Sequence, residues 1–299
     1  MKVLVTGGSG QVGKEINELK PNWVYITSDM FDLTNCEDVE NMYKTYEPDV
    51  VIHLAAKVGG ILDNIKLPSE YFSDNILMNT LLVNYAKKFG VDRFIGILST
   101  CIYPDNVKTY PMKEEYLHDG PPTRTNFSYG IAKRGMSVHI DAMNKQHGTN
   151  YCYLTPCNLY GVHDKFDGRS HFVAALIKKI YEAKRLGEDK IRLFGTGTPL
   201  RQFMNAKDFG RIIVSMVDNN INKSFNVATQ ENISIDTIAR IALKSLDCEH
   251  MSIEYDSTKP DGQYRKDVDT TKFINLFPDF KFIKLEDGIR EVFEKVFLK

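Results

Sequence analysis

Residues 2–14 read Lys2-Val-Leu-Val-Thr6-Gly7-Gly-Ser-Gly10-Gln-Val-Gly13-Lys14, and this stretch decides the fold. A short apolar run leads directly into glycines at every third position, and a helix-like segment begins after them. Glycine is needed in such a pattern for a tight turn, for close approach of the backbone to a pyrophosphate, and for close packing of helix on strand. The N-terminus of the following helix presents N–H groups to phosphates. The stretch therefore predicts a dinucleotide-binding turn rather than an ordinary glycine-rich loop.

Short apolar runs alternate with amphipathic stretches through the first half of the chain. We predict strands at 2–6, 24–27, 50–55, 93–99 and 151–155, and helices at 11–19, 36–46, 71–89 and 128–146. Strands that alternate with helices form a parallel sheet with right-handed crossovers. After Pro156 the alternation breaks up, and loop-rich segments surround predicted helices at 171–183, 235–246 and 286–297.

The predicted fold class is α/β, with a Rossmann-type doubly wound parallel sheet and a smaller, partly discontinuous C-terminal domain that binds the substrate. We expect the first domain to comprise residues 1–157 together with about 208–229. The second domain should comprise residues 158–207 and 230–299, with the substrate cleft between the two.

Composition narrows the function classes. The formal net charge of the 299-residue chain is −1, which argues against nucleic acid or an anionic membrane as the main partner. Its five cysteines are an odd number without C-x-x-C spacing, so we expect neither a disulfide framework nor a bound metal. The sequence shows no signal-peptide pattern and no apolar stretch long enough to span a bilayer. We therefore expect a cytoplasmic protein.

The second predicted strand carries the residues that choose between the two nicotinamide dinucleotides. Asp29 could accept a hydrogen bond from a ribose 2′-hydroxyl, whereas Ser28 together with Lys14 could hold a 2′-phosphate. Asp32 and Leu33 are placed to flank the adenine. These residues alone leave the choice open.

The catalytic candidates are Tyr129 and Lys133, in the segment Tyr129-Gly-Ile-Ala-Lys133, and Ser99 at a predicted strand end. Spacing of four places the tyrosine and the lysine on one face of a helix. Reduction of a ketone requires a proton for the oxygen, and a nearby ammonium should lower the tyrosine pKa from about 10 toward working pH. The Ser99 hydroxyl can hold the carbonyl. A tyrosine and a lysine at this spacing are common on helices, but their combination with the glycine motif favours an enzyme.

The chain resembles the GDP-L-fucose synthase family of extended short-chain dehydrogenases/reductases along nearly its whole length. The matching stretches are Val5–Lys14, His53–Gly60, Ser99–Pro104, Tyr129–Lys133, Asn158–Gly161, Ser170-His171, Gly195–Gly197 with Arg201, and Lys259–Gly262. The resemblance implies NADP-dependent 3,5-epimerisation and 4-reduction of GDP-4-keto-6-deoxy-D-mannose to GDP-L-fucose. It also implies a homodimer formed through the helices at 71–89 and 128–146.

The resemblance also assigns roles to residues. The reductase triad would be Ser99, Tyr129 and Lys133, and the epimerase pair would be Cys101 and His171. NADP would contact Gly7, Gly10, Gln11, Val12, Gly13, Lys14, Ser28, Asp32, Leu33, Leu54, Ala55, Ala56, Tyr129, Lys133, Pro156 and His171. The GDP-sugar would contact Ser99, Thr100, Cys101, Asn158, Lys179, Phe194, Arg201 and Lys259. We interpret His53 as a residue packed beside the cofactor rather than a proton carrier.

Two alternatives remain open. The chain departs from the family pattern in the loop Val162–Ser170, at Ala174 and at Phe194, which favours a reductase that acts only at C4 of a related GDP-4-keto sugar such as a heptose. The other alternative is a non-catalytic NADP-binding protein built on the same fold.

Overall fold

A six-stranded parallel sheet forms the centre of the computed structural model, which describes residues 1–167, 170–259 and 261–298. Its strand order is β10-β5-β4-β3-β1-β2. The strands are β1 (Val3–Thr6), β2 (Val24–Ile26), β3 (Val50–His53), β4 (Arg93–Ile97), β5 (Asn150–Pro156) and β10 (Phe225–Val227). The predicted α/β fold class with a parallel sheet is thus confirmed. No helix in the described part of the chain has the length and apolar character needed to cross a membrane.

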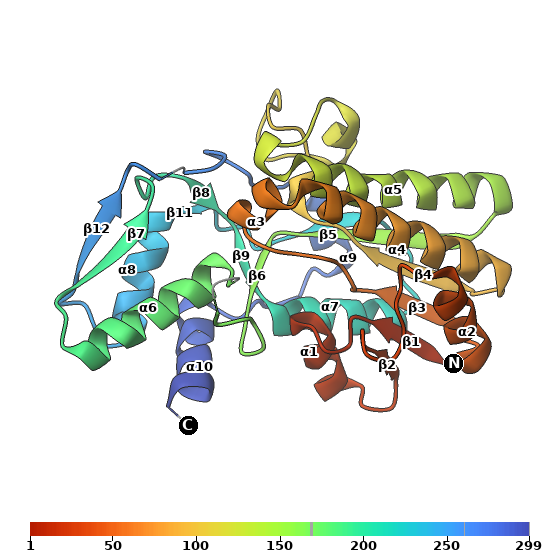
Figure 1. Cartoon of the computed structure of the whole chain (residues 1–299), viewed down its shortest axis with the longest axis horizontal. Coiled ribbons are helices and arrows are strands. Elements are labelled where there is room, and N and C mark those ends of the chain that lie inside the picture. Colours follow the sequence, from red (N-terminus) through yellow and green to blue (C-terminus); the bar gives the residue numbers. More distant parts are fainter. Residues whose placement is uncertain (168–169, 260, 299) are drawn as a thin grey trace.

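Helices cover both faces of this sheet, as Figure 1 shows. Contacts group α2 (Cys36–Tyr46) with α4 (Pro68–Lys88) and α5 (Phe127–His147), and they pair α1 (Gln11–Leu19) with α7 (Ala206–Asp218). The chain leaves β1 for β2 on one side and then crosses to β3 on the other. In doubly wound folds the ligand crevice lies outside the strand ends at this reversal. The loops after β1 and β3 are therefore where a cofactor should bind.

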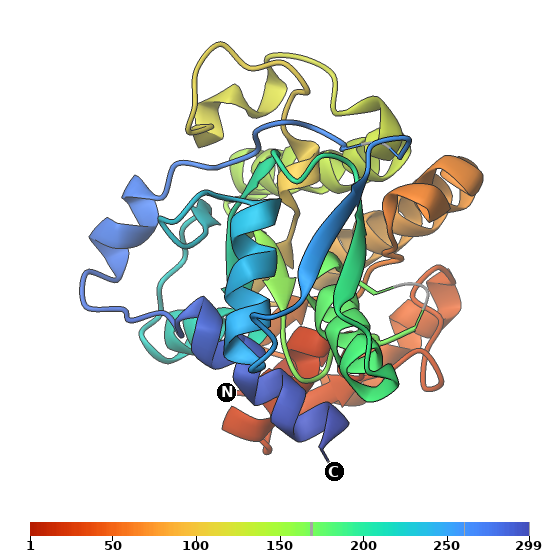
Figure 2. The ribbon, with the colours of Figure 1, turned by 90° about the vertical axis from the view of Figure 1, so that its left-hand side faces the viewer.

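The second part of the molecule contains shorter elements, which Figure 2 shows from its own side. The parallel pair β7 (Lys190–Phe194) and β12 (Ser252–Asp256) packs beside α6 (Phe172–Leu186) and α8 (Ile235–Ser245), which also contact each other. The remaining elements are β6 (Asn158–Tyr160), β8 (Leu200–Arg201), β9 (Phe203–Asn205), β11 (Ile233–Ser234) and α10 (Leu285–Phe297). The helices here match the predicted ones within three residues at either end, but the strands were not predicted.

Two hydrophobic cores correspond to these two parts. The first surrounds the parallel sheet, and the second is enclosed by α6, α8, α10 and β7. Residues 268–282, which include α9 (Thr271–Leu276), pack on the first core through Val268 and Phe273. We retain the division into two domains as a proposal and place this segment with the first.

Candidate active site

The turn after β1 is shaped to accept a phosphate-bearing ligand. Gly7 has φ +72°, and a Cβ there would lie 2.8 Å from Ala55 N in the loop after β3. A Cβ on Gly13 would lie 2.4 Å from Gly7 O, so both positions require glycine. Helix α1 begins at Gln11 without a side-chain cap, and the buried Gln11 Nε2 has no hydrogen-bond partner among the described residues. These features fit a bound pyrophosphate at the N-terminus of α1.

The predicted adenine-side residues lie around the end of β2. Ser28, Asp29 and Lys14 are exposed, while Leu33 is buried in the first core. The Asp32 carboxylate accepts hydrogen bonds from Thr34 N at 2.9 Å and Thr34 Oγ1 at 2.7 Å, which lower the Asp32 pKa. Asp32 is thus held by its own turn, whereas Ser28 and Lys14 remain accessible to a ligand.

His53, at the end of β3, links β1 to α4 through both of its ring nitrogens. Its Nδ1 lies 2.8 Å from Thr6 Oγ1, and its Nε2 lies 3.0 Å from Asn79 Oδ1. Asn79 in turn donates to Ala132 O in α5 at 3.2 Å. Burial lowers the pKa of His53 to about 3, so the ring is neutral. Thr6 Oγ1, its hydrogen-bond partner, also accepts from Ala55 N at 3.3 Å and so ties the loop after β3 to β1. This arrangement agrees with our interpretation of His53 as a packed residue.

Ser99 and Tyr129 meet where β4 ends and α5 begins, and Lys133 lies four residues further along α5. Tyr129 and Lys133 occupy the first turns of α5 and are buried, and the Ser99 hydroxyl hydrogen-bonds to Tyr129. The sequence argument predicted a lowered tyrosine pKa, but the structure gives a raised one because burial outweighs the Ser99 hydrogen bond. Burial also lowers the pKa of Lys133 to about 7.

Cys101 lies in a 3₁₀ turn (Thr100–Ile102) directly after Ser99. Its Sγ accepts hydrogen bonds from Lys266 Nζ at 3.0 Å and from Asn126 Nδ2 at 3.3 Å. Burial raises the pKa of the thiol, but the Lys266 charge and the hydrogen bonds to Lys266, Ser99 and Asn126 outweigh it, so the pKa lies below its ordinary value. The sequence analysis missed Lys266 and Asn126, because no local pattern marks contacts across 165 and 25 residues.

His171 precedes α6, and its side chain is half-exposed. Its Nδ1 lies 3.2 Å from Oδ1 of the buried Asp164, a partner that the sequence analysis also missed. The hydrogen bond to Asp164 raises the pKa of His171, burial opposes this effect, and a charge on Cys101 raises it further. The same charge acts on Arg201 and on Tyr129. Cys101 therefore lies within electrostatic reach of His171, Arg201 and Tyr129.

The predicted sugar-nucleotide residues form a second group beside this one. The ring of Phe194 is 61% exposed, and Lys179 Nζ and Lys259 Nζ lie 5.7 and 5.9 Å from its centroid. Arg201 is partly buried, and Asn158 Nδ2 donates to Gln202 O at 3.0 Å. Pro260 of the predicted Lys259–Gly262 motif lies outside the described residues.

Asp261 holds the Gly195–Gly197 loop beside Phe194. Its carboxylate accepts hydrogen bonds from Thr196 N at 2.7 Å and from Thr196 Oγ1 at 2.8 Å. The result is an exposed aromatic face flanked by two cations, which suits a stacked base with neighbouring phosphates. We did not predict a role for Asp261.

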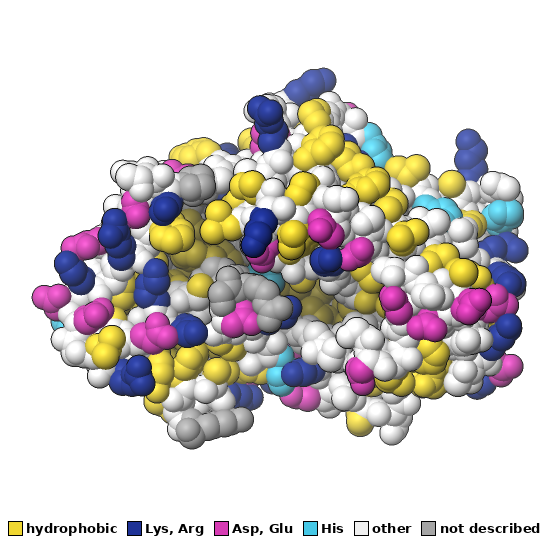
Figure 3. Space-filling view, viewed as in Figure 1, with side chains coloured by type: hydrophobic (Ala, Val, Ile, Leu, Met, Phe, Trp, Pro, Cys, Tyr) yellow, Lys and Arg dark blue, Asp and Glu magenta, His cyan; other side chains and the backbone are white. Residues whose placement is uncertain are grey.

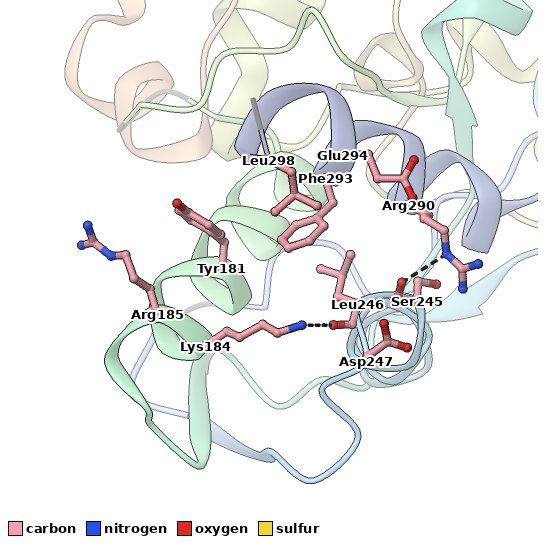
Figure 4. Close-up of a pocket in the computed structure, with 10 residues that line it drawn as sticks. All are labelled: Tyr181, Lys184, Arg185, Ser245, Leu246, Asp247, Arg290, Phe293, Glu294 and Leu298. Carbon is pink, nitrogen blue, oxygen red and sulfur yellow. Dashed lines mark hydrogen bonds between the residues drawn. The ribbon is translucent and has the colours of Figure 1, made fainter.

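Two other candidate sites involve residues that were not predicted. A cavity of about 400 Å³ between α6, α8 and α10 is lined by Tyr181, Lys184, Phe293 and neighbouring residues, none of them predicted for the site. Figure 4 shows the Lys184 ammonium turned to the Leu246 carbonyl, which lies 2.9 Å away.

A group of potential metal ligands is formed by Glu15, Glu18 and His163, and His163 Nε2 lies 3.1 Å from Glu18 Oε1. The expectation that the protein binds no metal stays a prediction.

Comparison with known proteins agrees with this geometry. The model of the NAD dependent epimerase/dehydratase family matches residues 3–228. GDP-L-fucose synthase of Dictyostelium discoideum is 37% identical over 97% of this chain and 93% of its own length. The crystal structure of a GDP-L-fucose synthetase from Naegleria fowleri bound to NADP has a TM-score of 0.88 and 31% identity, covering 98% of this chain and 91% of that one.

A second similar structure shows the fold alone. It is a GDP-6-OMe-4-keto-L-xylo-heptose reductase from C. jejuni, with a TM-score of 0.89 and 23% identity over 98% of this chain and 96% of that one.

The doubly wound sheet, the glycine turn and the buried tyrosine and lysine define an oxidoreductase that uses a nicotinamide dinucleotide. The chain belongs to the NAD dependent epimerase/dehydratase family, and within it to the group that contains the GDP-L-fucose synthases.

Proposed function

We propose that this protein converts GDP-4-keto-6-deoxy-D-mannose to GDP-L-fucose by NADPH-dependent 3,5-epimerisation and 4-reduction. The observation that carries the proposal is that the Ser99 hydroxyl accepts a hydrogen bond from Cys101 N at 3.3 Å and also hydrogen-bonds to Tyr129, while the charge of Cys101 acts on His171. This arrangement supports a substrate pocket that a nucleophilic sulfur, an imidazole and a phenol would share. A reductase alone would need only the phenol and its neighbours.

The cofactor in this proposal is NADP. Its pyrophosphate would rest on the Gly7–Gly13 turn and the N-terminus of α1, and its 2′-phosphate would meet the exposed Ser28 and Lys14. The Naegleria fowleri relative was crystallised with NADP. When bound, NADPH supplies the hydride for C4.

Epimerisation uses the acidity that a C4 ketone gives to C3 and C5, because the resulting carbanion is an enolate. The Cys101 sulfur, whose pKa is lowered, removes each proton as a thiolate. His171, whose pKa is raised by its hydrogen bond to Asp164, would return a proton from the opposite face. After the first inversion, the Cys101 thiol would lose its proton to water and His171 would take one up, which readies both groups for the second carbon. The two opposite pKa shifts thus suit a base and an acid working at one pH.

Reduction then involves the triad. Tyr129 donates its proton to the C4 oxygen, and its raised pKa keeps the phenol protonated until the alkoxide develops. Ser99 holds the same oxygen through its hydroxyl. Lys133, buried beneath the site, would hold the cofactor ribose with its ammonium.

The GDP portion would extend away from these groups toward the second domain. The base would lie on the exposed Phe194 ring, and Lys179, Lys259 and Arg201 would face the diphosphate. Five free cysteines fit a reducing compartment, and we infer that the enzyme acts on its GDP-sugar in the cytoplasm.

Reaction with GDP-4-keto-6-deoxy-D-mannose and NADPH in deuterium oxide tests the proposal. NMR of the product should show deuterium at C3 and C5 in GDP-L-fucose. Cys101→Ser should abolish this labelling and still leave measurable reduction of the unepimerised ketone. A wild-type product that carries deuterium at neither C3 nor C5 would reject epimerisation. It would favour the C4 reductase that the altered loop Val162–Ser170 suggested.

A further inference from the structure

We propose that Lys266 is a positioning residue for Cys101, because its ammonium lies 3.0 Å from the sulfur and holds it as the thiolate that abstracts the sugar protons. This inference rests on the proposed epimerase function and names the residue that makes its base competent.

The position of Lys266 is fixed by the fold. The segment that follows it is tied to the loop at Met112 by backbone hydrogen bonds, Met112 N to Asp267 O at 2.9 Å and Asp269 N to Met112 O at 2.8 Å. Val268 N also donates to Gln202 Oε1 at 2.9 Å. The backbone next to Lys266 is therefore held by hydrogen bonds, which fixes the position from which the lysine reaches the sulfur.

The carboxylate next to Lys266 in the sequence is paired with another cation, so it does not compete with Cys101 Sγ for the ammonium. Arg265 engages both oxygens of Asp267, at 2.6 and 2.9 Å, so the adjacent carboxylate already has a cation. Among residues 1–167, 170–259 and 261–298, no carboxylate forms an ion pair with Lys266. An ammonium that meets a thiol instead of a carboxylate stabilises the ionised sulfur.

The charged and titratable groups of the described residues that act on the sulfur come from several elements. Lys266 contributes its charge from the C-terminal segment, His171 comes from the start of α6, and Arg201 comes from β8. Tyr129 faces it from α5, and Ser99 and Asn126 offer uncharged hydrogen bonds. Burial alone would raise the thiol pKa, and the charge of Lys266 is the largest opposing effect.

The pH dependence of thiol alkylation tests the inference without substrate. All variants carry Cys36→Ser, because Cys36 is exposed, whereas Cys152, Cys157 and Cys248 are buried with raised pKa values. Iodoacetamide is the probe, and Cys101→Ser gives the background. Lys266→Met should slow alkylation near neutral pH at least about tenfold and move the profile to higher pH, since an opposite charge at this distance changes the acid dissociation constant by that much or more.

Two further variants serve as controls. Lys266→Arg keeps the charge and should retain most of the wild-type profile. Lys272→Met removes a cation that pairs with Glu114 at 3.3 Å instead of reaching the sulfur, and it should leave the profile unchanged. An unchanged profile in folded Lys266→Met, or an equal change in Lys272→Met, overturns the inference.

Turnover separates this role from binding of the diphosphate. With the keto-sugar in deuterium oxide, Lys266→Met should lose labelling at C3 and C5 more than it loses reduction, and labelling should recover as pH rises. An equal rise in KM for both reactions with an unaltered alkylation profile would make Lys266 a phosphate ligand and overturn the proposal. Absence of labelling in the wild type, with the alkylation shift intact, would instead reject the epimerase function.

Discussion

At the scale of single residues, the proposed reduction step depends on two ionisable side chains, Tyr129 and Lys133, which are both buried. Tyr129→Phe removes the proton donor and changes little in shape. We expect ketone reduction to fall about 10²–10⁴-fold, the usual contribution of a positioned acid. The decrease in NADPH absorbance measures this rate, and fluorescence titration should show unchanged NADPH affinity.

The reduction rate and the NADPH affinity of Tyr129→Phe also test the alternative that the protein binds NADP without catalysing a reaction. Normal cofactor binding with lost reduction means that the phenol serves chemistry, and a sensor would not need it. If Tyr129→Phe reduced the keto-sugar as fast as the wild type, the proton would come from another group and the proposed triad would be wrong.

Lys133 predicts a pH-dependent stability in the protein without cofactor. Its side chain is 2% exposed, and burial lowers its pKa from 10.5 to about 7. Between these two values the unfolded chain binds more protons than the folded chain, so this residue makes stability rise with pH across that window. Below it, the folded protein bears the full cost of a buried ammonium.

Lys133→Met should therefore raise the melting temperature by several degrees near pH 6 and by much less near pH 10. Differential scanning calorimetry at the two pH values measures the difference. Lys145→Met, an exposed lysine on the same helix, should change little at either pH. Equal gains for Lys133→Met at both values would contradict the lowered pKa.

The turn between β1 and α1 gives a prediction at the scale of elements. Gly13→Ala would place a Cβ 2.4 Å from Gly7 O, and the backbone there cannot yield without displacing the phosphate site. We expect a loss of about 1–3 kcal/mol in the free energy of unfolding, as for other overpacked positions, together with weakened NADPH binding. Urea denaturation and fluorescence titration measure the two effects.

Gly60→Ala provides the matched comparison. A Cβ on Gly60 meets no atom within 4 Å, so the same chemical change should alter stability by no more than about 0.5 kcal/mol. Similar losses in the two variants would mean that general backbone freedom, rather than close packing in the turn, explains the glycine at position 13.

Elements with strong periodicity could be predicted from the sequence, and short ones could not. The strands β1, β3 and β4 are continuous buried runs, and α5 carries its catalytic face at a spacing of four residues. The pairs β8 with β11 and β6 with β9 have two or three residues in each strand, too few for a period to emerge. Their pairing is fixed by tertiary contacts.

The same limit applies to the candidate site. Motifs located Tyr129, Lys133 and the glycines, because a local pattern carries their chemistry. Lys266 reaches Cys101 only through the return of the C-terminal segment to the first core, near Val268. Such a contact depends on the three-dimensional path of the chain, so no spacing along the sequence could predict it.

At the scale of the whole molecule, the question is whether α4 and α5 form a dimer interface, as the resemblance implied. The two helices pack side by side, and Figure 3 shows hydrophobic side chains among the polar ones over this region. Leu77 on α4 is 47% exposed, and Val138 on α5 is 52% exposed. Exposed apolar side chains on adjoining helices are typical of a surface that a second copy covers.

We propose that the protein forms a dimer through this surface, and the double variant Leu77→Asp/Val138→Asp should then be a monomer. Under two-fold symmetry each new carboxylate meets its copy or an apolar surface, and the cost of several kcal/mol should weaken association at least about 100-fold. Sedimentation velocity measures the change. Leu186→Asp, at a 65% exposed site on α6, introduces the same charge away from these helices and should stay dimeric. A wild-type monomer, or a double variant that remains dimeric, would place the contact between copies elsewhere.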